Sequence, residues 1–235
     1  MEKLLRGIHK FQSDVFHARR DMFSQLVSGQ RPQALFITCS DSRVVPELLT
    51  QAGPGALFVL RNAGNLVPPY SPAGCGESAT IEYAIRGLGV QEIIVCGHTR
   101  CGAMHACLEP DCLKDMPRVR NWLTHADASV EIVVTQYSEL APEARWKVLI
   151  QENVLVQIEN LKTHPAVATA LAKNELRLHA WVYKMETGQI FAYDPRSGQY
   201  MPLVRDDGFS SPQSFTRKDR DRGFELGEAM ARSVI

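Results

Sequence analysis

The 235-residue sequence has no long hydrophobic run, no excess of charge of either sign and no recognisable secretion signal. Its longest apolar stretches, such as ALFIT and EIIVC, are far shorter than the roughly 20 residues that a membrane-spanning helix needs. The 26 basic residues equal the 26 acidic residues, so the charge balance indicates neither nucleic acid nor an acidic membrane as a partner. The N-terminus MEKLLRGIHKF has no small-residue cleavage site after an apolar core, so no signal peptide is expected.

The six cysteines include no pair separated by two residues, which excludes a CxxC redox motif. In a chain of this length without a secretion signal, they fit a reducing compartment better than a disulfide framework, and we expect the protein to be cytoplasmic. A cysteine with no chemical role is usually a small core residue, and this is the prediction for Cys75, Cys96, Cys107 and Cys112.

Three short apolar runs predict β-strands: ALFIT (34–38), ALFVL (56–60) and EIIVC (92–96). Helical patterns separate them, including one over 76–86. Continuous apolar strands that alternate with helices are typical of a parallel sheet covered on both faces. We therefore predict an α/β fold with a mainly parallel central β-sheet flanked by helices.

The rest of the chain suggests an arm, one domain and a tail. The spacing of apolar residues predicts a helix over 1–28, helical structure from 117 to about 161, a helix over about 166–173, and a strand pair from LRLHAWVYKM and QIFAYD. The last residues are polar and charged. The predicted organisation is an N-terminal helical arm at 1–30, a single domain at 31–205 and a C-terminal tail at 206–235.

Chemically active side chains follow two of the predicted strands directly. Cys39, Asp41 and Arg43 come after the first strand, and His98 and Cys101 after the third. In open α/β sheets, ligands bind beyond the carboxyl ends of the strands. We expect these five side chains to meet in one crevice although the two groups lie far apart in the sequence.

Two thiolates and one imidazole form a ligand set that suits zinc, and we predict one Zn²⁺ per subunit at Cys39, His98 and Cys101. Three protein ligands leave a fourth tetrahedral position open, as in catalytic zinc sites. Asp41 is close enough in sequence either to take that position or to orient a zinc-bound water. Arg43 would hold this carboxylate in a fork-shaped pair and lower its pKa.

Four motifs in order resemble those of the β-class carbonic anhydrases: CSDSR (39–43), RNAGN (61–65), GESATIEYA (76–84) and GHTRCGAM (97–104). The resemblance runs from about residue 3 to residue 204 and makes 31–205 the catalytic domain. It implies reversible hydration of CO2 to bicarbonate and a proton, by attack of zinc-bound hydroxide on CO2. It also implies intertwined homodimers or higher even-numbered oligomers.

The resemblance assigns roles to individual residues. Cys39, His98 and Cys101 match the zinc ligands of the family, and Asp41 and Arg43 match its catalytic dyad. The glycine whose backbone N–H bonds a substrate oxygen corresponds to Gly102.

Three further residues match a plant-like subtype in which water, rather than aspartate, occupies the fourth zinc position. Gln30, Phe58 and Tyr83 stand where that subtype has the glutamine, phenylalanine and tyrosine of its substrate pocket. In the family, these residues line the apolar side of the pocket, and some of them are contributed across the dimer interface. Without the resemblance they would be interpreted as a loop residue, a strand core residue and a helix core residue.

Several alternatives stay open at this point. One alternative function is hydrolysis of a related linear molecule such as CS2 or COS by the same zinc hydroxide. Another is a zinc-stabilised scaffold, which predicts a fourth protein ligand and does not need the Asp41–Arg43 pair. His105 is either a proton shuttle or an exposed helical histidine without that role. The tail is either a disordered end or a partner-binding extension. A carboxysome or an organelle stroma is an alternative location.

Overall fold

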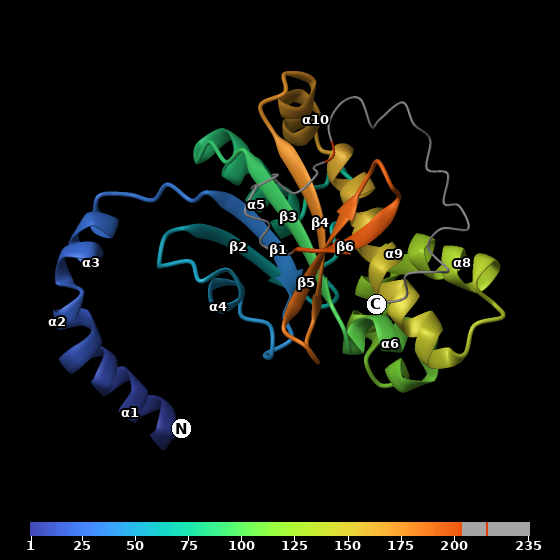
Figure 1. The fold of residues 1–235 in the computed structure, drawn as a ribbon, viewed down its shortest axis with the longest axis horizontal. Coiled ribbons are helices and arrows are strands. Elements are labelled where there is room, and N and C mark those ends of the chain that lie inside the picture. The colour runs from blue at the N-terminus through green and yellow to red at the C-terminus, as the bar shows by residue number, and fades with distance from the viewer. Residues whose placement is uncertain (204–214, 216–235) are drawn as a thin grey trace.

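The computed structural model describes residues 1–203 and Phe215 (Figure 1). The predicted tail at 206–235 therefore lies outside the described residues, apart from Phe215. The main-chain N–H of this residue donates to Leu178 O at 3.0 Å, and its buried ring stacks on Tyr193.

A six-stranded sheet with the strand order β2-β1-β3-β4-β5-β6 forms the centre of the protein. The first four strands of this order run parallel, whereas β4–β5 and β5–β6 pair antiparallel. The mainly parallel α/β fold predicted from the sequence is confirmed, while β6 was not predicted. The strands are β1 (Ala34–Cys39), β2 (Leu57–Asn62), β3 (Glu92–His98), β4 (Arg177–Lys184), β5 (Gln189–Asp194) and β6 (Gln199–Pro202).

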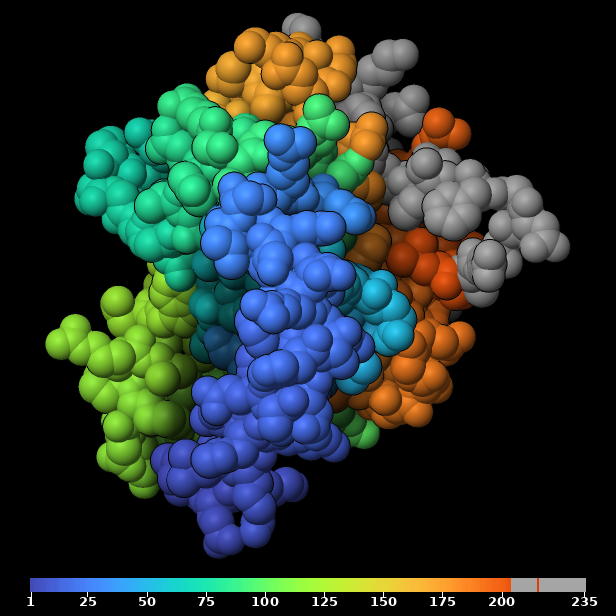
Figure 2. Space-filling model, turned by 90° about the vertical axis from the view of Figure 1, so that its left-hand side faces the viewer, coloured from blue at the N-terminus to red at the C-terminus, as the bar shows by residue number. Residues whose placement is uncertain are grey.

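The N-terminal segment forms a helical arm that extends away from the sheet (Figure 1). Figure 2 shows the same arm from the side, in front of the body of the protein. The predicted helix over 1–28 is interrupted at Arg19, whose φ of −122° and ψ of 26° leave the helical region. None of the arm's helical residues is buried against the described part of the chain. The arm consists of α1 (Glu2–Lys10), a π-helical turn (Phe11–Val15), α2 (Phe16–Ala18) and α3 (Arg20–Val27).

The helical region predicted from 117 to about 161 is divided into three helices. A 3₁₀ turn (Thr124–Ala126) joins the first two helices. The third helix begins at Pro142, because proline is well tolerated at the first position of a helix. The remaining helices of the body are α4 (Pro46–Thr50), α5 (Gly76–Glu82), α6 (Gly102–Leu108), α7 (Pro117–Leu123), α8 (Asp127–Gln136), α9 (Pro142–Lys162) and α10 (Pro165–Ala172). No helix in the described part of the chain is both long and apolar enough to span a membrane.

The two faces of the sheet are buried unequally. Because side chains alternate along a strand, Leu35 and Ile37 point into the large core that includes α9, whereas Phe36 points to the opposite face. That opposite face has a small cluster of buried residues, bordered by partly buried ones such as Trp181. Within one chain, helices thus cover one face of the sheet more fully than the other.

Helix α9 crosses the sheet very close to the end of β3. A Cβ at Gly97 would lie 2.7 Å from Val154 Cγ2, so only glycine allows this approach. Gly97 directly precedes His98. The packing of α9 against Gly97 therefore fixes the position of His98 relative to α9.

Candidate metal centre

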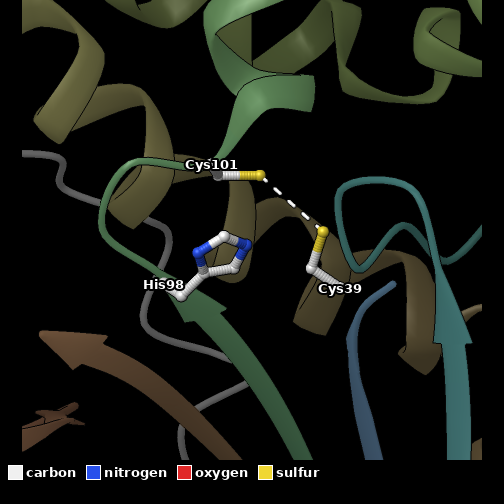
Figure 3. Close-up of side chains that lie close together, drawn as sticks. All are labelled: Cys39, His98 and Cys101. Atoms are coloured by element: carbon white, nitrogen blue, oxygen red, sulfur yellow. Dashed lines mark hydrogen bonds between the residues drawn. The ribbon is translucent and has the colours of Figure 1, made fainter. Parts of the chain in front are cut away.

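Cys39, His98 and Cys101 meet at the carboxyl ends of neighbouring parallel strands. Cys39 ends β1, His98 ends β3, and Cys101 is the residue before α6. All three side chains are buried, and their sulfur and nitrogen atoms lie within 4.8 Å of one another. Figure 3 shows the imidazole and the two thiols facing a common space. The structure thus brings together the three ligands predicted from the sequence.

The geometry of this group fits a tetrahedral zinc ion. The two sulfur atoms are 3.9 Å apart. Two thiolates that bind zinc at about 2.3 Å in a tetrahedron lie about 3.8 Å apart. The Nδ1 of His98 donates to Thr99 O at 2.9 Å, while its buried Nε2 has no hydrogen-bond partner among the described residues. The ring therefore presents a free lone pair to the sulfur atoms, as a metal ligand must.

The two thiols share one proton when no metal is bound. The hydrogen bond from Cys101 is the main cause that lowers the pKa of Cys39 to about 4, against the opposing effect of burial. The N–H of Gly64, 3.4 Å from the sulfur of Cys39, also stabilises the thiolate. The same hydrogen bond, together with burial, raises the pKa of Cys101. A divalent cation replaces this proton, because both sulfur ligands bind metal as thiolates.

Asp41 lies beside the three ligands and is held by Arg43. The guanidinium donates to both carboxylate oxygens, from Nε at 2.9 Å and from Nη2 at 2.7 Å. This pairing keeps the pKa of Asp41 well below its usual range, so the group is a carboxylate at neutral pH. Its Oδ2 lies 4.0 Å from His98 Nε2. The Asp41 carboxylate is therefore a negatively charged hydrogen-bond acceptor next to Cys39, His98 and Cys101. It does not belong to their close group of ligand atoms.

Known proteins of similar sequence show to which family this chain belongs. The sequence model of the carbonic anhydrase family matches residues 34–190. The chain is 48% identical over 204 residues to a carbonic anhydrase of Pseudomonas aeruginosa, which covers 87% of this chain and 92% of that protein. The chain belongs to the carbonic anhydrase family.

Solved structures support the same assignment. The β-carbonic anhydrase CcaA superposes with a TM-score of 0.84 at 45% identity, over 86% of this chain and 98% of that one. A tetrameric β-carbonic anhydrase of Sordaria macrospora gives a TM-score of 0.72 at 28% identity, over 81% of this chain and 95% of that one. The protein is thus a carbonic anhydrase of the prokaryotic β-class type.

The residues predicted for the substrate pocket lie in two places. Gly102 follows Cys101 at the start of α6, where a backbone N–H has no partner within the helix. Phe58 and Tyr83 lie together, with ring centroids 6.0 Å apart. In the strand register, however, Phe58 pairs with Leu35 rather than with Cys39.

This register separates Phe58 from the candidate metal ligands of its own chain. Four residues of extended strand span about 13 Å, so Phe58 lies about that far from the level of Cys39. The exposed Gln30 precedes the amino end of β1, whereas Cys39 ends that strand. Within one chain, these pocket residues are therefore displaced toward the opposite end of the strands.

Other cysteines and His105 have ordinary surroundings. Cys96 is buried, as predicted, and burial raises its pKa to about 12. Cys112 is exposed instead of buried, while Cys75 and Cys107 are half-buried. His105 is exposed on α6, and its ring packs edge-on against Trp146 with centroids 4.9 Å apart.

Several residues of the centre were not identified from the sequence. Arg61 donates to Cys39 O at 3.1 Å and to Asp41 O at 2.7 Å, and thus fixes the main chain between ligand and dyad. Its position at the end of β2 was the available signal. Trp146 donates from Nε1 to Cys101 O at 3.1 Å. No sequence signal links Trp146 to a ligand 45 residues earlier, because that contact depends on how α9 packs.

Proposed function

We propose that this carbonic anhydrase binds one zinc ion through Cys39, His98 and Cys101 and hydrates CO2 reversibly to bicarbonate and a proton. The observation that carries the proposal is the placement of two buried sulfur atoms and one imidazole nitrogen within 4.8 Å of one another, the nitrogen having no hydrogen-bond partner in the described part of the chain. The Asp41–Arg43 pair beside them supports a reactive centre over a purely structural zinc site, since a structural site needs neither residue.

The chain's own residues then have defined tasks. Zinc, when bound, lowers the pKa of a coordinated water from 15.7 to about 7 and so supplies a hydroxide nucleophile near neutral pH. Asp41, kept ionised by Arg43, accepts a hydrogen bond from the nucleophile and aims it at CO2. The free N–H of Gly102 donates to the substrate oxygen on which negative charge develops.

The Asp41–Arg43 contacts also support the plant-like subtype, in which aspartate stays off the metal. Both carboxylate oxygens of Asp41 accept hydrogen bonds from Arg43, so the charged pair holds this carboxylate beside the ligand group. Gln30, Phe58 and Tyr83 are proposed to line the apolar side of the pocket, with Gln30 also donating to the substrate.

We propose further that the working form is a homodimer or a higher even-numbered oligomer. The arm exposes large apolar side chains such as Leu4, Ile8 and Phe11, and soluble monomers rarely leave such a surface uncovered. A second copy of the chain would also cover the less buried face of the sheet. A second copy that supplies Phe58 and Tyr83 to the metal centre would account for their displacement from Cys39. CO2 and bicarbonate are the small-molecule partners, and no nucleic acid or membrane is proposed.

The six free thiols fit a cytoplasmic location, which we propose for this protein. We also propose that the tail at 206–235 binds a protein partner.

The decisive experiment is stopped-flow CO2 hydration with the purified protein across pH, with bound zinc quantified in the same samples. We expect one zinc per chain and a rate that rises with pH near neutrality. A parallel assay with CS2 tests the related hydrolase activity. Rapid CS2 turnover without CO2 hydration would contradict the proposed substrate, and a zinc-free active protein would contradict the proposed metal.

A further inference from the structure

The two residues between His98 and Cys101 form a constrained loop. Arg100 has a φ of +61°, a left-handed conformation that is unfavourable for a residue with a side chain. Thr99 is buried, and its N–H donates to Tyr183 O on the neighbouring strand β4 at 2.9 Å. Such a conformation persists only where surrounding contacts hold it. Those contacts therefore bear on the placement of both metal ligands.

Glu186, in the turn between β4 and β5, holds both loop residues at once. Its Oε2 accepts a hydrogen bond from Thr99 Oγ1 at 2.7 Å, and its Oε1 accepts one from Arg100 Nε at 3.3 Å. The main chain of the same turn takes part too, because the N–H of Met185 donates to Thr99 Oγ1 at 3.0 Å. The β4–β5 turn thus holds Thr99 and Arg100 in place by hydrogen bonds, although no residue of the turn belongs to the ligand group.

The main-chain carbonyls of Thr99 and Arg100 each accept one hydrogen bond from a residue of the metal centre. Thr99 O accepts the hydrogen bond from His98 Nδ1 at 2.9 Å and so sets the direction in which Nε2 points. Arg100 O accepts from Arg43 Nη2 at 3.1 Å, and the same nitrogen donates to Asp41. One carboxylate is therefore connected to a ligand by one route and to the dyad by the other.

We propose that Glu186 is a positioning residue of the metal centre, acting through Thr99 on the ring of His98 and through Arg100 on the Arg43–Asp41 pair. The proposal rests on the zinc-dependent function described above. It assigns a role to a hairpin turn that lies 85 residues after Cys101 in the sequence, outside the four motifs that mark the family.

A simple surface ion pair does not describe these contacts. The Glu186 side chain is 42% exposed, and an exposed pair with Arg100 alone would add little to stability. The hydrogen bond from the buried hydroxyl of Thr99 is the shorter of the two, and it is also the main cause of the lowered pKa of Glu186. The expected effect of removing Glu186 is therefore on the placement of the ligand and dyad rather than on global stability.

The first test measures how fast zinc leaves the loaded enzyme for an excess of a chromogenic chelator. Loss of residues that orient metal ligands typically weakens metal binding by about 10- to 100-fold, and we expect Glu186→Ala to release zinc about 10 times faster than wild type. Glu186→Gln is expected to lie near wild type, because its amide oxygen still accepts from Thr99. Steady-state CO2 hydration should show a lower kcat for Glu186→Ala with little change in KM.

A double-variant cycle identifies the route to His98. Thr99→Val removes the hydroxyl that Glu186 accepts from, so the double variant Thr99→Val/Glu186→Ala should release zinc scarcely faster than the more affected single variant. Glu131→Ala is the matched control, since Glu131 also accepts from a threonine hydroxyl, that of Thr135, but on the exposed surface of α8. This control should release zinc at the wild-type rate.

Zinc release by Glu186→Ala at the wild-type rate would overturn the proposal, and so would additive effects in the cycle. These outcomes differ from failure of the proposed function, in which the wild-type protein itself would hold no zinc or leave CO2 unhydrated.

Discussion

Arg43 donates hydrogen bonds to both side-chain oxygens of Asp41, and its main-chain N–H adds a third bond to Oδ1 at 3.0 Å. The carboxylate is therefore fixed in direction as well as in charge. Because the same guanidinium also donates to Arg100 O, the dyad is attached to the loop that carries His98 and Cys101. In the proposed function, the placement of the metal ligands and the orientation of the nucleophile would thus be coupled through Arg43.

Replacing Arg43 by lysine should separate charge from orientation. Arg43→Lys keeps the positive charge but cannot form the fork-shaped pair, so Asp41 loses its fixed direction. A misplacement of about 1 Å in such a group costs on the order of 100-fold in rate, and we expect kcat/KM for CO2 hydration to fall by about that factor with zinc retained. Stopped-flow rates and metal analysis of the same preparation measure both quantities.

Arg6→Lys alters an exposed pair with Glu2 on the arm and serves as the control for this substitution. Its rate should match that of wild type. An unchanged rate in Arg43→Lys would show that the fork is dispensable.

Removing one sulfur ligand should remove the metal. In Cys101→Ser a hydroxyl replaces a soft thiolate, and the remaining two ligands hold zinc too weakly to survive dialysis. We expect less than about a tenth of the wild-type zinc content and a corresponding loss of hydration. Cys112→Ser, at an exposed cysteine, is the control and should keep both. Stoichiometric zinc with a normal rate in Cys101→Ser would refute the ligand assignment.

The parallel strands and the proximity of Cys39, His98 and Cys101 could be predicted from the sequence because local patterns determine them. The runs before Cys39 and His98 predicted strands, and parallel strands bring their carboxyl ends to one edge of the sheet. The ligands then had to meet there. The Asp41–Arg43 pair was equally accessible, since two residues of separation places both side chains at one turn.

Contacts that depend on packing between distant elements could not be predicted in this way. Glu186 reaches Thr99 only because β4 pairs with β3 in one particular register, and the sequence of the turn does not specify that register. Strand β6 is short and of ordinary polarity, so its pattern did not stand out. The displacement of Phe58 from Cys39 likewise follows from the β1–β2 register alone.

A buried carboxyl that is not a member of the ligand group predicts a pH effect on stability. Glu152 on α9 is fully buried, and this burial raises its pKa from 4.5 to about 7, although the hydroxyl of Tyr137 donates to it at 3.5 Å. The folded protein therefore binds this proton more tightly than the unfolded chain does. The free energy of unfolding should fall as pH rises from about 4.5 to about 7, by up to about 3 kcal/mol from this residue.

Glu152→Gln cannot ionise and should lack this contribution. We expect the variant to gain stability relative to wild type between pH 5 and pH 8, measured by urea denaturation at one fixed protein concentration because oligomers gain stability with concentration. Glu159→Gln changes a half-buried carboxylate on the same helix, paired with Lys162, and is the control. A difference between Glu152→Gln and wild type that stays constant with pH would contradict the protonation of Glu152.

The distance between Phe58 and Cys39 in one chain leads to a test of the shared pocket. If a second copy supplies Tyr83 to the metal centre, a heterodimer of Cys101→Ser and Tyr83→Ala subunits contains one centre with both defects and one with neither. If each chain builds its own pocket, both centres of the heterodimer carry a defect. Two different affinity tags on co-expressed chains allow the heterodimer to be purified.

The two arrangements predict different rates. We expect Tyr83→Ala alone to hydrate CO2 about 10 times more slowly than wild type, because the half-exposed ring shapes the apolar side of the pocket. With a shared pocket, the heterodimer should reach about half of the wild-type rate, because a C2 dimer has two equivalent centres. With separate pockets it should reach about a twentieth, and this result would place Tyr83 with the metal ligands of its own chain. Zinc content should be one ion per heterodimer in either case, so the rate alone discriminates between the two arrangements.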